Sequence, residues 1–252
     1  MDNFKNLIYK NYATNHTLAL YGQESLLSFK RNFPVWNFYF SKLLPYNKES
    51  KILDIGCGKG SFVYFLQNQG YNNAIGIDIS EEQIKIGKDL GIKNIDCADL
   101  RTFLSENINK FDCIVARDVM EHFTRQEIFE ILQLIKKSLK DNGSFIMQSP
   151  NGEGLFFSHI YYGDFTHETV FTRSSLNQIF NTLNFSQIEF KSTSPVPKGL
   201  LSVIRYVIWG IIVVVLRGLK MIQTGSASGI FTQNIIAKAI SEDSKNNKEQ
   251  SI

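Results

Sequence analysis

Between residues 51 and 148 the chain alternates five short apolar runs with helix-length segments, and this alternation limits the fold more than any other feature. The runs are expected as strands over residues 51–55, 74–79, 94–98, 111–116 and 144–148, with two more over 185–191 and 231–240. Strands joined by helices favour right-handed βαβ units. We therefore expect an α/β fold with a Rossmann-like, mostly parallel seven-stranded sheet that helices cover on both faces. Ligands of such sheets bind beyond the carboxyl ends of the strands.

The remaining segments suggest one domain with additions. We expect a helical N-terminal lid over residues 1–45, a core over 46–195, an apolar helical insertion over 196–228, the last core strand over 229–240 and a disordered tail over 241–252. Pro34 and Pro45 are expected to break the lid into two or three short helices. Helices are also expected after the caps at Ser80 and Thr124, and the helix that Thr124 caps is expected to end before Gly143. Residues 1–10 are polar, so no signal peptide is expected.

Composition and charge exclude several classes. At 43% hydrophobic and 20% charged residues the chain is neither collagen-like nor disordered. The net charge of +3 is uneven: residues 190–252 hold eight Lys/Arg and three Asp/Glu, and the rest is slightly acidic. A local basic segment argues against a protein that coats nucleic acid. Cys57, Cys97 and Cys113 are expected as reduced, buried thiols of a cytoplasmic protein.

A glycine loop between the first expected strand and its helix suggests the ligand. The loop holds Gly56, Gly58 and Gly60, and Asp54 stands two residues before the first glycine. A dinucleotide loop would carry its third glycine where Ser61 stands. A carboxylate at Asp54 suits a cation better than a pyrophosphate, which leaves an NAD-linked oxidoreductase as a minor alternative.

Two further carboxylates follow the next strands. Asp78 can accept hydrogen bonds from both hydroxyls of a ribose, and Asp99 can accept one from an exocyclic amine. The ligand implied by these groups has a ribose, an adenine-like base and a positive charge.

Four ordered motifs over residues 45–195 resemble those of class I S-adenosylmethionine-dependent methyltransferases. They are Ile52-Leu-Asp-Ile-Gly-Cys-Gly-Lys-Gly60, Gly76-Ile-Asp-Ile-Ser80, Asp96-Cys-Ala-Asp99 and Phe111-Asp-Cys-Ile-Val-Ala-Arg-Asp118. The resemblance implies S-adenosylmethionine as cofactor, with Asp78 on the ribose, Asp99 and Leu100 on the adenine, and Arg31 on the carboxylate as in ubiquinone-type O-methyltransferases. The implied cofactor-binding residues are Arg31, Asp54, Gly56, Gly58, Gly60, Asp78, Ile79, Asp99, Leu100 and Arg117.

A second set of polar residues follows the fourth and fifth strands. Asp118, Glu121 and His122 have the spacing of one helical turn, and His167 comes after the fifth strand. In one interpretation all four ligate a divalent metal, for which Mn²⁺, Fe²⁺ or Zn²⁺ suits the donors better than Mg²⁺. The set resembles that of small-RNA 2′-O-methyltransferases, with Asp118 in place of a glutamate.

Two other interpretations remain open for the same residues. In one, His122 or His167 is a catalytic general base, with Glu121 or Asp164 fixing its tautomer. In the other, Glu121 only caps a helix and His122 only packs in the fold.

The segment after the fifth strand indicates an acceptor. Residues 149–152 and 164–176 are similar to a pattern in methyltransferases linked to bacterial capsule and lipopolysaccharide synthesis. Aromatic residues that precede His167 could form an acceptor wall or pack within the loop: Phe156, Phe157, Tyr161 and Tyr162. The resemblance implies O-methylation of a surface-glycan precursor or its phosphate-containing substituent. The alternatives are a lipophilic acceptor such as a quinone precursor, and a catalytically silent cofactor-binding partner of a membrane complex.

The insertion suggests where the protein works. Its uncharged centre, residues 206–216, is shorter than the roughly 20 residues that a membrane span needs. Lys198, Arg205, Arg217 and Lys220 fall within about a third of a helix circumference. Residues 199–222 are therefore expected in peripheral contact with the cytoplasmic face of the inner membrane. The alternatives are a helix buried against the domain, against a partner or against a dimer mate.

Overall fold

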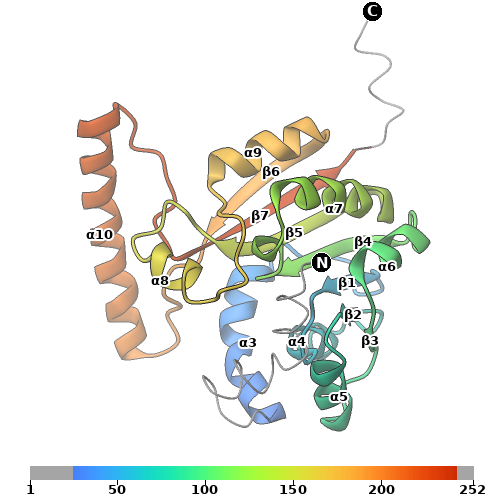
Figure 1. Cartoon of the computed structure of the whole chain (residues 1–252). Helices are drawn as coiled ribbons and strands as arrows, with labels where there is room; N and C mark the ends of the chain where they lie inside the picture. The colour runs from blue at the N-terminus through green and yellow to red at the C-terminus, as the bar shows by residue number, and fades with distance from the viewer. Residues whose placement is uncertain (1–24, 243–252) are drawn as a thin grey trace, which may run out of the picture.

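The computed structural model describes residues 25–242 and shows a seven-stranded sheet between layers of helices (Figure 1). The strand order is β3-β2-β1-β4-β5-β7-β6, in which only β7 runs against its neighbours. This arrangement confirms the predicted α/β fold class. The strands are β1 (Ile52–Ile55), β2 (Ile75–Asp78), β3 (Ile95–Cys97), β4 (Phe111–Arg117), β5 (Leu139–Pro150), β6 (Phe185–Ser192) and β7 (Asn234–Ser241).

Helices cover both faces of the sheet because the strand side chains alternate between two buried clusters. Ile52, Cys113 and Val115 pack toward α3 (Leu26–Phe40), α4 (Ser61–Asn68) and α5 (Glu81–Asp89). Leu53 and Ile114 pack toward the opposite layer, which holds α6 (Leu100–Glu106), α7 (Arg125–Ser138) and α9 (Arg173–Thr182). Three elements lie off these layers: η2 (Met120–His122), α8 (Phe157–Tyr161) and α10 (Leu200–Thr224).

Side-chain caps begin two of the expected helices. The Ser80 hydroxyl accepts from the Gln83 N–H at the start of α5, and Thr124 forms a reciprocal capping box with Glu127 at the start of α7. Helix α7 ends before Gly143 as predicted; its last residue is Ser138, and β5 begins directly after it. Residues 139–143 pair irregularly with the start of β4 instead of extending the helix.

The predicted helix break at Pro34 is wrong. Pro34 lies inside α3, a helix of 15 residues that continues past the proline to Phe40. Proline removes one backbone donor, but it is exposed here and aromatic packing holds the helix on both sides of it. Phe33 lies 5.3 Å from Phe65 and Phe40 lies 5.1 Å from Phe62, ring centre to ring centre. Tertiary packing therefore outweighs the local disruption.

Some expectations fall at or beyond the ends of the described chain. The lid residues 1–24 and the tail residues 243–252 lie outside the described residues. The last strand, expected over 229–240, forms over Asn234–Ser241, so it includes the first residue that was assigned to the tail. Cys57 and Cys113 are buried as expected, whereas Cys97 is exposed, because β3 is the edge strand of the sheet.

The aromatic packing of α3 gives a stability test. Phe40→Ala should lower the free energy of unfolding by about 3–5 kcal/mol, because the fully buried ring is removed and a cavity is left in its place. Phe38→Ala, on the same helix at 38% exposure, is the matched control and should cost under about 1 kcal/mol. Urea unfolding of both variants checks this, and equal losses would mean that α3 is not anchored through Phe40.

Candidate active site

The glycine loop leaves β1 at the carboxyl edge of the sheet and needs glycine for two reasons. Gly56, Gly58 and Gly60 all have positive φ, at 66°, 56° and 75°. At Gly56 there is also no room, since a Cβ atom would lie 2.3 Å from a methyl carbon of Val119. The loop backbone is thereby held against the segment that follows β4, where the second group of polar residues begins.

Asp78 fixes this loop from the neighbouring strand. Its carboxylate accepts the N–H of Gly58 at 2.8 Å and the N–H of Ser80 at 2.8 Å, one on each oxygen. Burial raises the pKa of Asp78, and these two hydrogen bonds oppose the rise. Each oxygen keeps a second lone pair with which it can accept a hydrogen bond from a ligand hydroxyl.

Two buried groups of opposite charge lie beside the loop. Asp54 is 2% exposed, and burial raises its pKa to about 7 despite the positive charge of Arg117. Arg117 at the end of β4 stacks against Phe62 and Trp36, with its guanidinium carbon 4.3 and 4.8 Å from the two ring centres. Its buried Nε and Nη1 have no hydrogen-bond partner within residues 25–242. A buried guanidinium without a partner is a site for an anionic ligand group.

The other predicted cofactor residues lie along the same edge. Asp99 caps α6 by accepting the N–H groups of Arg101 and Thr102 through Oδ1, so it serves the helix as well as any ligand. Leu100 is half-buried in the first turn of α6, and Ile79 is 44% exposed directly after β2. Arg31 is exposed on α3.

Glu121 lies in the short η2 turn and is 1% exposed. One carboxylate oxygen accepts the Ser149 hydroxyl at 3.1 Å. Burial, together with the negative charge of Asp118, raises the pKa of Glu121 well above its ordinary value. A buried carboxyl of this kind either holds a proton or faces a positive charge.

The segment that carries His167 is clamped onto η2. The N–H groups of Glu168 and Thr169 both donate to the Glu121 carbonyl, at 2.8 and 3.1 Å. These bonds bring His122 and His167 together, with ring centres 4.7 Å apart. Histidines 45 positions apart in the chain therefore share one site, as their places after neighbouring strands predicted.

Hydrogen bonds fix the tautomer of both histidines. His167 Nδ1 lies 2.9 Å from the Tyr161 carbonyl oxygen, which only accepts, so Nδ1 carries the proton. His122 Nδ1 lies 2.8 Å from the Thr166 hydroxyl, which donates its own proton to Asp164 at 2.6 Å. His122 Nδ1 must therefore donate as well. In both neutral rings the lone pair is on Nε2, the arrangement of a base or a metal ligand.

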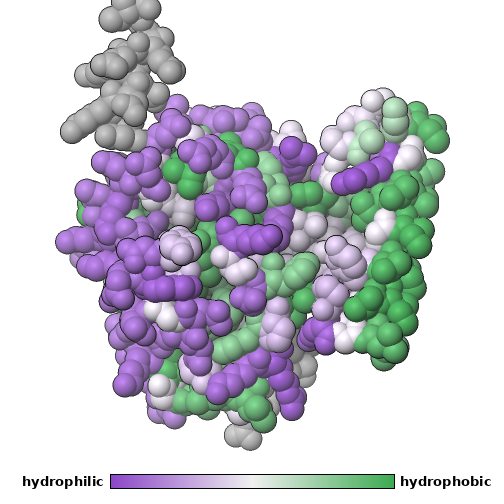
Figure 2. Space-filling model, turned by 180° about the vertical axis from the view of Figure 1, so that it is seen from behind, coloured by the Kyte–Doolittle hydropathy of each residue, from purple (hydrophilic) through white to green (hydrophobic). Residues whose placement is uncertain are grey.

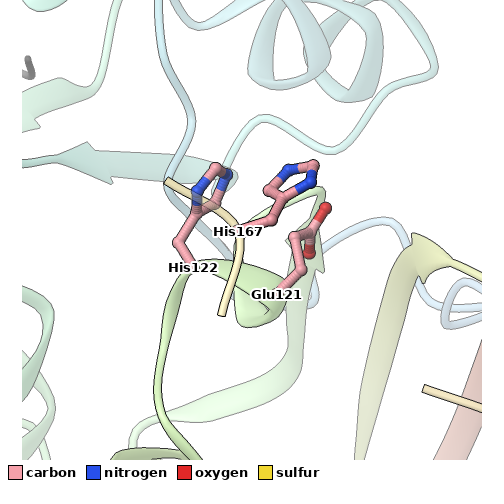
Figure 3. A group of neighbouring side chains, drawn as sticks. All are labelled: Glu121, His122 and His167. Atoms are coloured by element: carbon pink, nitrogen blue, oxygen red, sulfur yellow. The ribbon is translucent and has the colours of Figure 1, made fainter. Parts of the chain in front are cut away.

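Three of the four predicted metal ligands come together (Figure 3). Glu121, His122 and His167 each offer a donor atom, and these atoms lie within 4.8 Å of one another. Asp118 is not in this group, and its carboxylate instead accepts from Gln148 Nε2 at 2.9 Å. The predicted helical turn from Asp118 to His122 is wrong at its start. Asp118 has a left-handed φ of 55°, so the backbone is not helical there and bends before η2 begins.

Sequence reasoning missed the groups that orient these side chains. Ser149, Thr166 and the Tyr161 carbonyl act on Glu121, His122 and His167. Asp164 was expected to fix a histidine tautomer, and it does so for His122 through Thr166 rather than directly. The Asp164-Phe-Thr166 spacing is the local signal that could have revealed it, because Asp164 also accepts the Thr166 N–H at 2.9 Å in a tight turn.

Comparison with known proteins places the chain in a family. The sequence model of the methyltransferase domain family matches residues 31–189, more than half of the chain. An uncharacterized protein of Rickettsia prowazekii is 33% identical over 126 residues, which are 46% of this chain and 50% of that protein. The mitochondrial ubiquinone biosynthesis O-methyltransferase of Rattus norvegicus is 36% identical over 116 residues, which are 42% of this chain and 32% of that protein. The chain thus spans half or less of these two relatives.

Solved structures share the fold. A SAM-dependent methyltransferase from Archaeoglobus fulgidus superposes with a TM-score of 0.62 at 21% identity, over 95% of this chain and all of the other. Phosphoethanolamine N-methyltransferase 2 of Haemonchus contortus, in complex with S-adenosyl-L-methionine, superposes with a TM-score of 0.60 at 15% identity, over 93% and 60%. The chain belongs to the methyltransferase domain family and has the class I fold of S-adenosylmethionine-dependent methyltransferases.

Proposed function

We propose that the chain transfers a methyl group from S-adenosylmethionine to a hydroxyl of a bacterial surface-glycan precursor, of the capsule or lipopolysaccharide kind, or of its phosphate-containing substituent. The observation that carries the proposal is the pair of histidines His122 and His167, whose Nδ1 hydrogen bonds leave Nε2 as the accepting nitrogen of each neutral ring, next to the buried Glu121. Transfer to a hydroxyl requires a group that removes its proton or lowers its pKa.

The cofactor side of the site fits S-adenosylmethionine. This cofactor supplies a methyl group that its sulfonium already activates. It carries one carboxylate, for which Nε and Nη1 of Arg117, which have no hydrogen-bond partner within residues 25–242, provide buried donors. It also carries positive charges, which the buried Asp54 can stabilise. Arg31, which is exposed, remains a second candidate for the carboxylate.

In the first form of the chemistry a histidine is the base. His167 Nε2, or His122 Nε2, accepts the hydroxyl proton as the oxygen bonds to the methyl carbon and the carbon–sulfur bond breaks. The positive ring that forms is stabilised by Glu121 and, for His122, by Thr166 and Asp164. No further reactant is needed, because the proton leaves to water afterwards.

In the second form a divalent metal is bound by Glu121, His122 and His167. The donor set fits, since it offers one carboxylate and two imidazole nitrogens whose other ring nitrogens are held by hydrogen bonds. Such a ligand set suits Mn²⁺, Fe²⁺ or Zn²⁺, and Mg²⁺ less well. The ion would lower the pKa of the acceptor hydroxyl.

Aromatic side chains support a sugar-like acceptor. Tyr161 lies 5.7 Å from His167, 5.1 Å from Tyr162 and 6.2 Å from Phe157, measured between ring centres. Phe156 and Tyr162 are 65% and 77% exposed on the same loop. Exposed aromatic faces next to a proton acceptor suit the apolar face of a sugar ring.

A second candidate acceptor is a lipophilic molecule such as a quinone precursor. The relative from Rattus norvegicus, whose name gives ubiquinone biosynthesis, favours it over the matched part of the chain. A catalytically silent, cofactor-binding membrane protein is the third alternative, and the two fixed histidine tautomers argue against it.

The acceptor can be found by comparing cells with and without the gene. We expect one methyl group to be missing from a nucleotide sugar or from the surface polysaccharide of the deleted strain, read by mass spectrometry. A missing methyl group on a quinone would instead support the second acceptor. Unchanged methylation in both fractions would contradict either form of the proposal.

His167→Ala should reduce methyl transfer at least about 100-fold while the dissociation constant for S-adenosylmethionine stays within about twofold. His159→Ala, an exposed histidine on α8, is the matched control and should retain activity. Both can be assayed with radiolabelled cofactor and a cell extract as acceptor source. Activity that survives exhaustive chelation selects the base mechanism, and activity that is lost and restored by added Mn²⁺ or Zn²⁺ selects the metal.

The affinity for S-adenosylmethionine should fall as the pH is lowered, because the Asp54 carboxylate becomes protonated. Its pKa of about 7 is raised, so the carboxyl is protonated, and thus neutral, below that pH. A cationic ligand binds the ionised form, and the ionised fraction drops about tenfold between pH 8 and pH 6. We expect the dissociation constant to rise by the same factor in calorimetric titrations. Asp54→Asn should bind weakly at pH 8 and lack this part of the pH dependence. An identical pH profile in both would contradict the role of Asp54.

A further inference from the structure

Helix α10 leaves its apolar side chains uncovered. Its most apolar stretch has a mean hydropathy of 2.1 and none of it is buried, and by length and composition it is the one described helix that could cross a membrane. In the view of Figure 2 these residues form a continuous hydrophobic column along one side of an otherwise mostly polar surface. An uncovered apolar surface of this extent marks an interaction site.

The helix has two distinct sides. Half-buried residues recur at spacings of seven, four, three and four along the side that faces the body: Ser202, Trp209, Val213, Leu216 and Lys220. The opposite half, about 180° wide at 100° per residue, has no charged side chain. It includes residues that are 55–85% exposed, among them Leu200, Val207, Ile211, Val214, Met221 and Ile222.

Basic residues lie between these two sides. Arg205 and Arg217 are exposed and flank the body-facing stripe, one on each side of it. Lys220 is 3.4 Å from Glu153 and so points back to the domain. Between Phe190 and Glu242 the chain has no acidic residue. Two copies paired through this helix would bring like charges together, whereas anionic lipid headgroups would neutralise them.

The connections of α10 oppose a membrane span. Both ends return to one point, where the Thr193 N–H donates to Thr232 Oγ1 at 3.1 Å and the Thr193 hydroxyl donates to the Asn234 carbonyl at 3.0 Å. The 25-residue helix is about 37 Å long. If it crossed the bilayer, residues 225–232 would have to return through the hydrocarbon as irregular backbone. Unpaired backbone groups exclude such a path.

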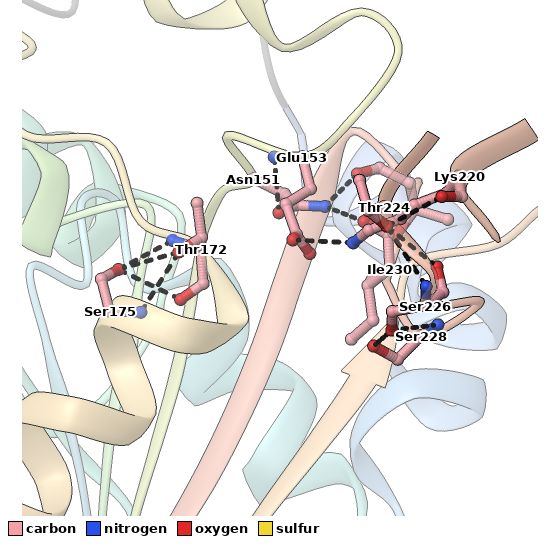
Figure 4. A network of polar contacts seen from close by, with 10 residues as sticks. Asn151, Glu153, Thr172, Ser175, Lys220, Thr224, Ser226, Ser228 and Ile230 are labelled. Carbon is pink, nitrogen blue, oxygen red and sulfur yellow. Dashed lines mark hydrogen bonds and ion pairs between the residues drawn. The ribbon is translucent and has the colours of Figure 1, made fainter. Parts of the chain in front are cut away.

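A polar network holds the return segment to the active-site edge instead (Figure 4). Asn151, directly after β5, donates to the carbonyls of Ile230 and Thr232 at 2.6 and 2.9 Å. Just after the end of α10, the hydroxyl oxygens of Ser226 and Ser228 are 2.9 Å apart and share a hydrogen bond. In Figure 1, α8 and its loop lie between α10 and the sheet. The helix is thus fixed beside the loop that leads to His167.

We propose that α10 lies in the plane of a membrane, with its uncharged half in an anionic bilayer and with Arg205 and Arg217 at the headgroups. In this position the carboxyl edge of the sheet is next to the lipid surface. The occupant of the apolar side is therefore a bilayer rather than a second copy of the chain.

Vesicle sedimentation of the full chain tests this proposal without any methyl acceptor. We expect binding to phosphatidylcholine vesicles with about 30% phosphatidylglycerol, and at least about tenfold weaker binding to pure phosphatidylcholine. Ile211→Glu should weaken binding to the anionic vesicles at least about tenfold. Ile108→Glu, at 48% exposure against 60% for Ile211, is the matched control and should bind like the wild type within about twofold.

Three outcomes would overturn the proposal. The wild type could stay in the supernatant with anionic vesicles, or both glutamate variants could lose binding equally. The third is a lipid-free dimer in analytical ultracentrifugation that Ile211→Glu converts to monomer, which would assign the apolar side to a second copy. Because the readout is binding, failure here leaves the methyl-transfer proposal to be judged by its own assays.

Discussion

The close contact between the glycine loop and the strand ends is the constraint on which the site depends. Gly58 donates to Asp78, and Gly56 lies where a side chain would overlap Val119. These two contacts join the ends of three strands that are neighbours in the sheet: the loop after β1, the end of β2 and the turn after β4. The parallel sheet brings the strand ends to one edge, but the loop sets how near a ligand can come to the backbone.

Several ionisable side chains are buried at this edge of the sheet, although burying a charged group costs free energy. Asp54 and Arg117 sit near each other without an ion pair between them, and Glu121 faces two histidines. Such groups destabilise the protein without a ligand, since burial opposes their charged forms. The core beneath them, built from tightly packed aromatic and aliphatic side chains, supplies the stability that tolerates them.

Much of the fold could be predicted because it follows from local patterns. Alternating strands and helices, with caps at Ser80 and Thr124, are sufficient to define the sheet and the start of two helices. Pro34 shows the limit of prediction from local patterns, since aromatic packing between residues distant in sequence decides whether this proline ends the helix. The site shows the same limit, because the left-handed bend at Asp118 and the Thr166 contact to His122 depend on segments that meet only after folding.

The antiparallel last strand has a consequence for how such a chain can diversify. Asn234 at the start of β7 pairs with Pro150 at the end of β5, so the connection from β6 emerges at the edge of the sheet that holds Glu121 and the two histidines. A segment inserted there interrupts no strand pair and contributes little to the core. Under the proposal that α10 lies in a membrane, exchanging that segment alone would change the surface that the protein binds and leave Glu121, His122 and His167 in place. In that proposal the membrane-binding segment and the methyl-transfer site are separate parts of the chain, which meet at the carboxyl edge of the sheet.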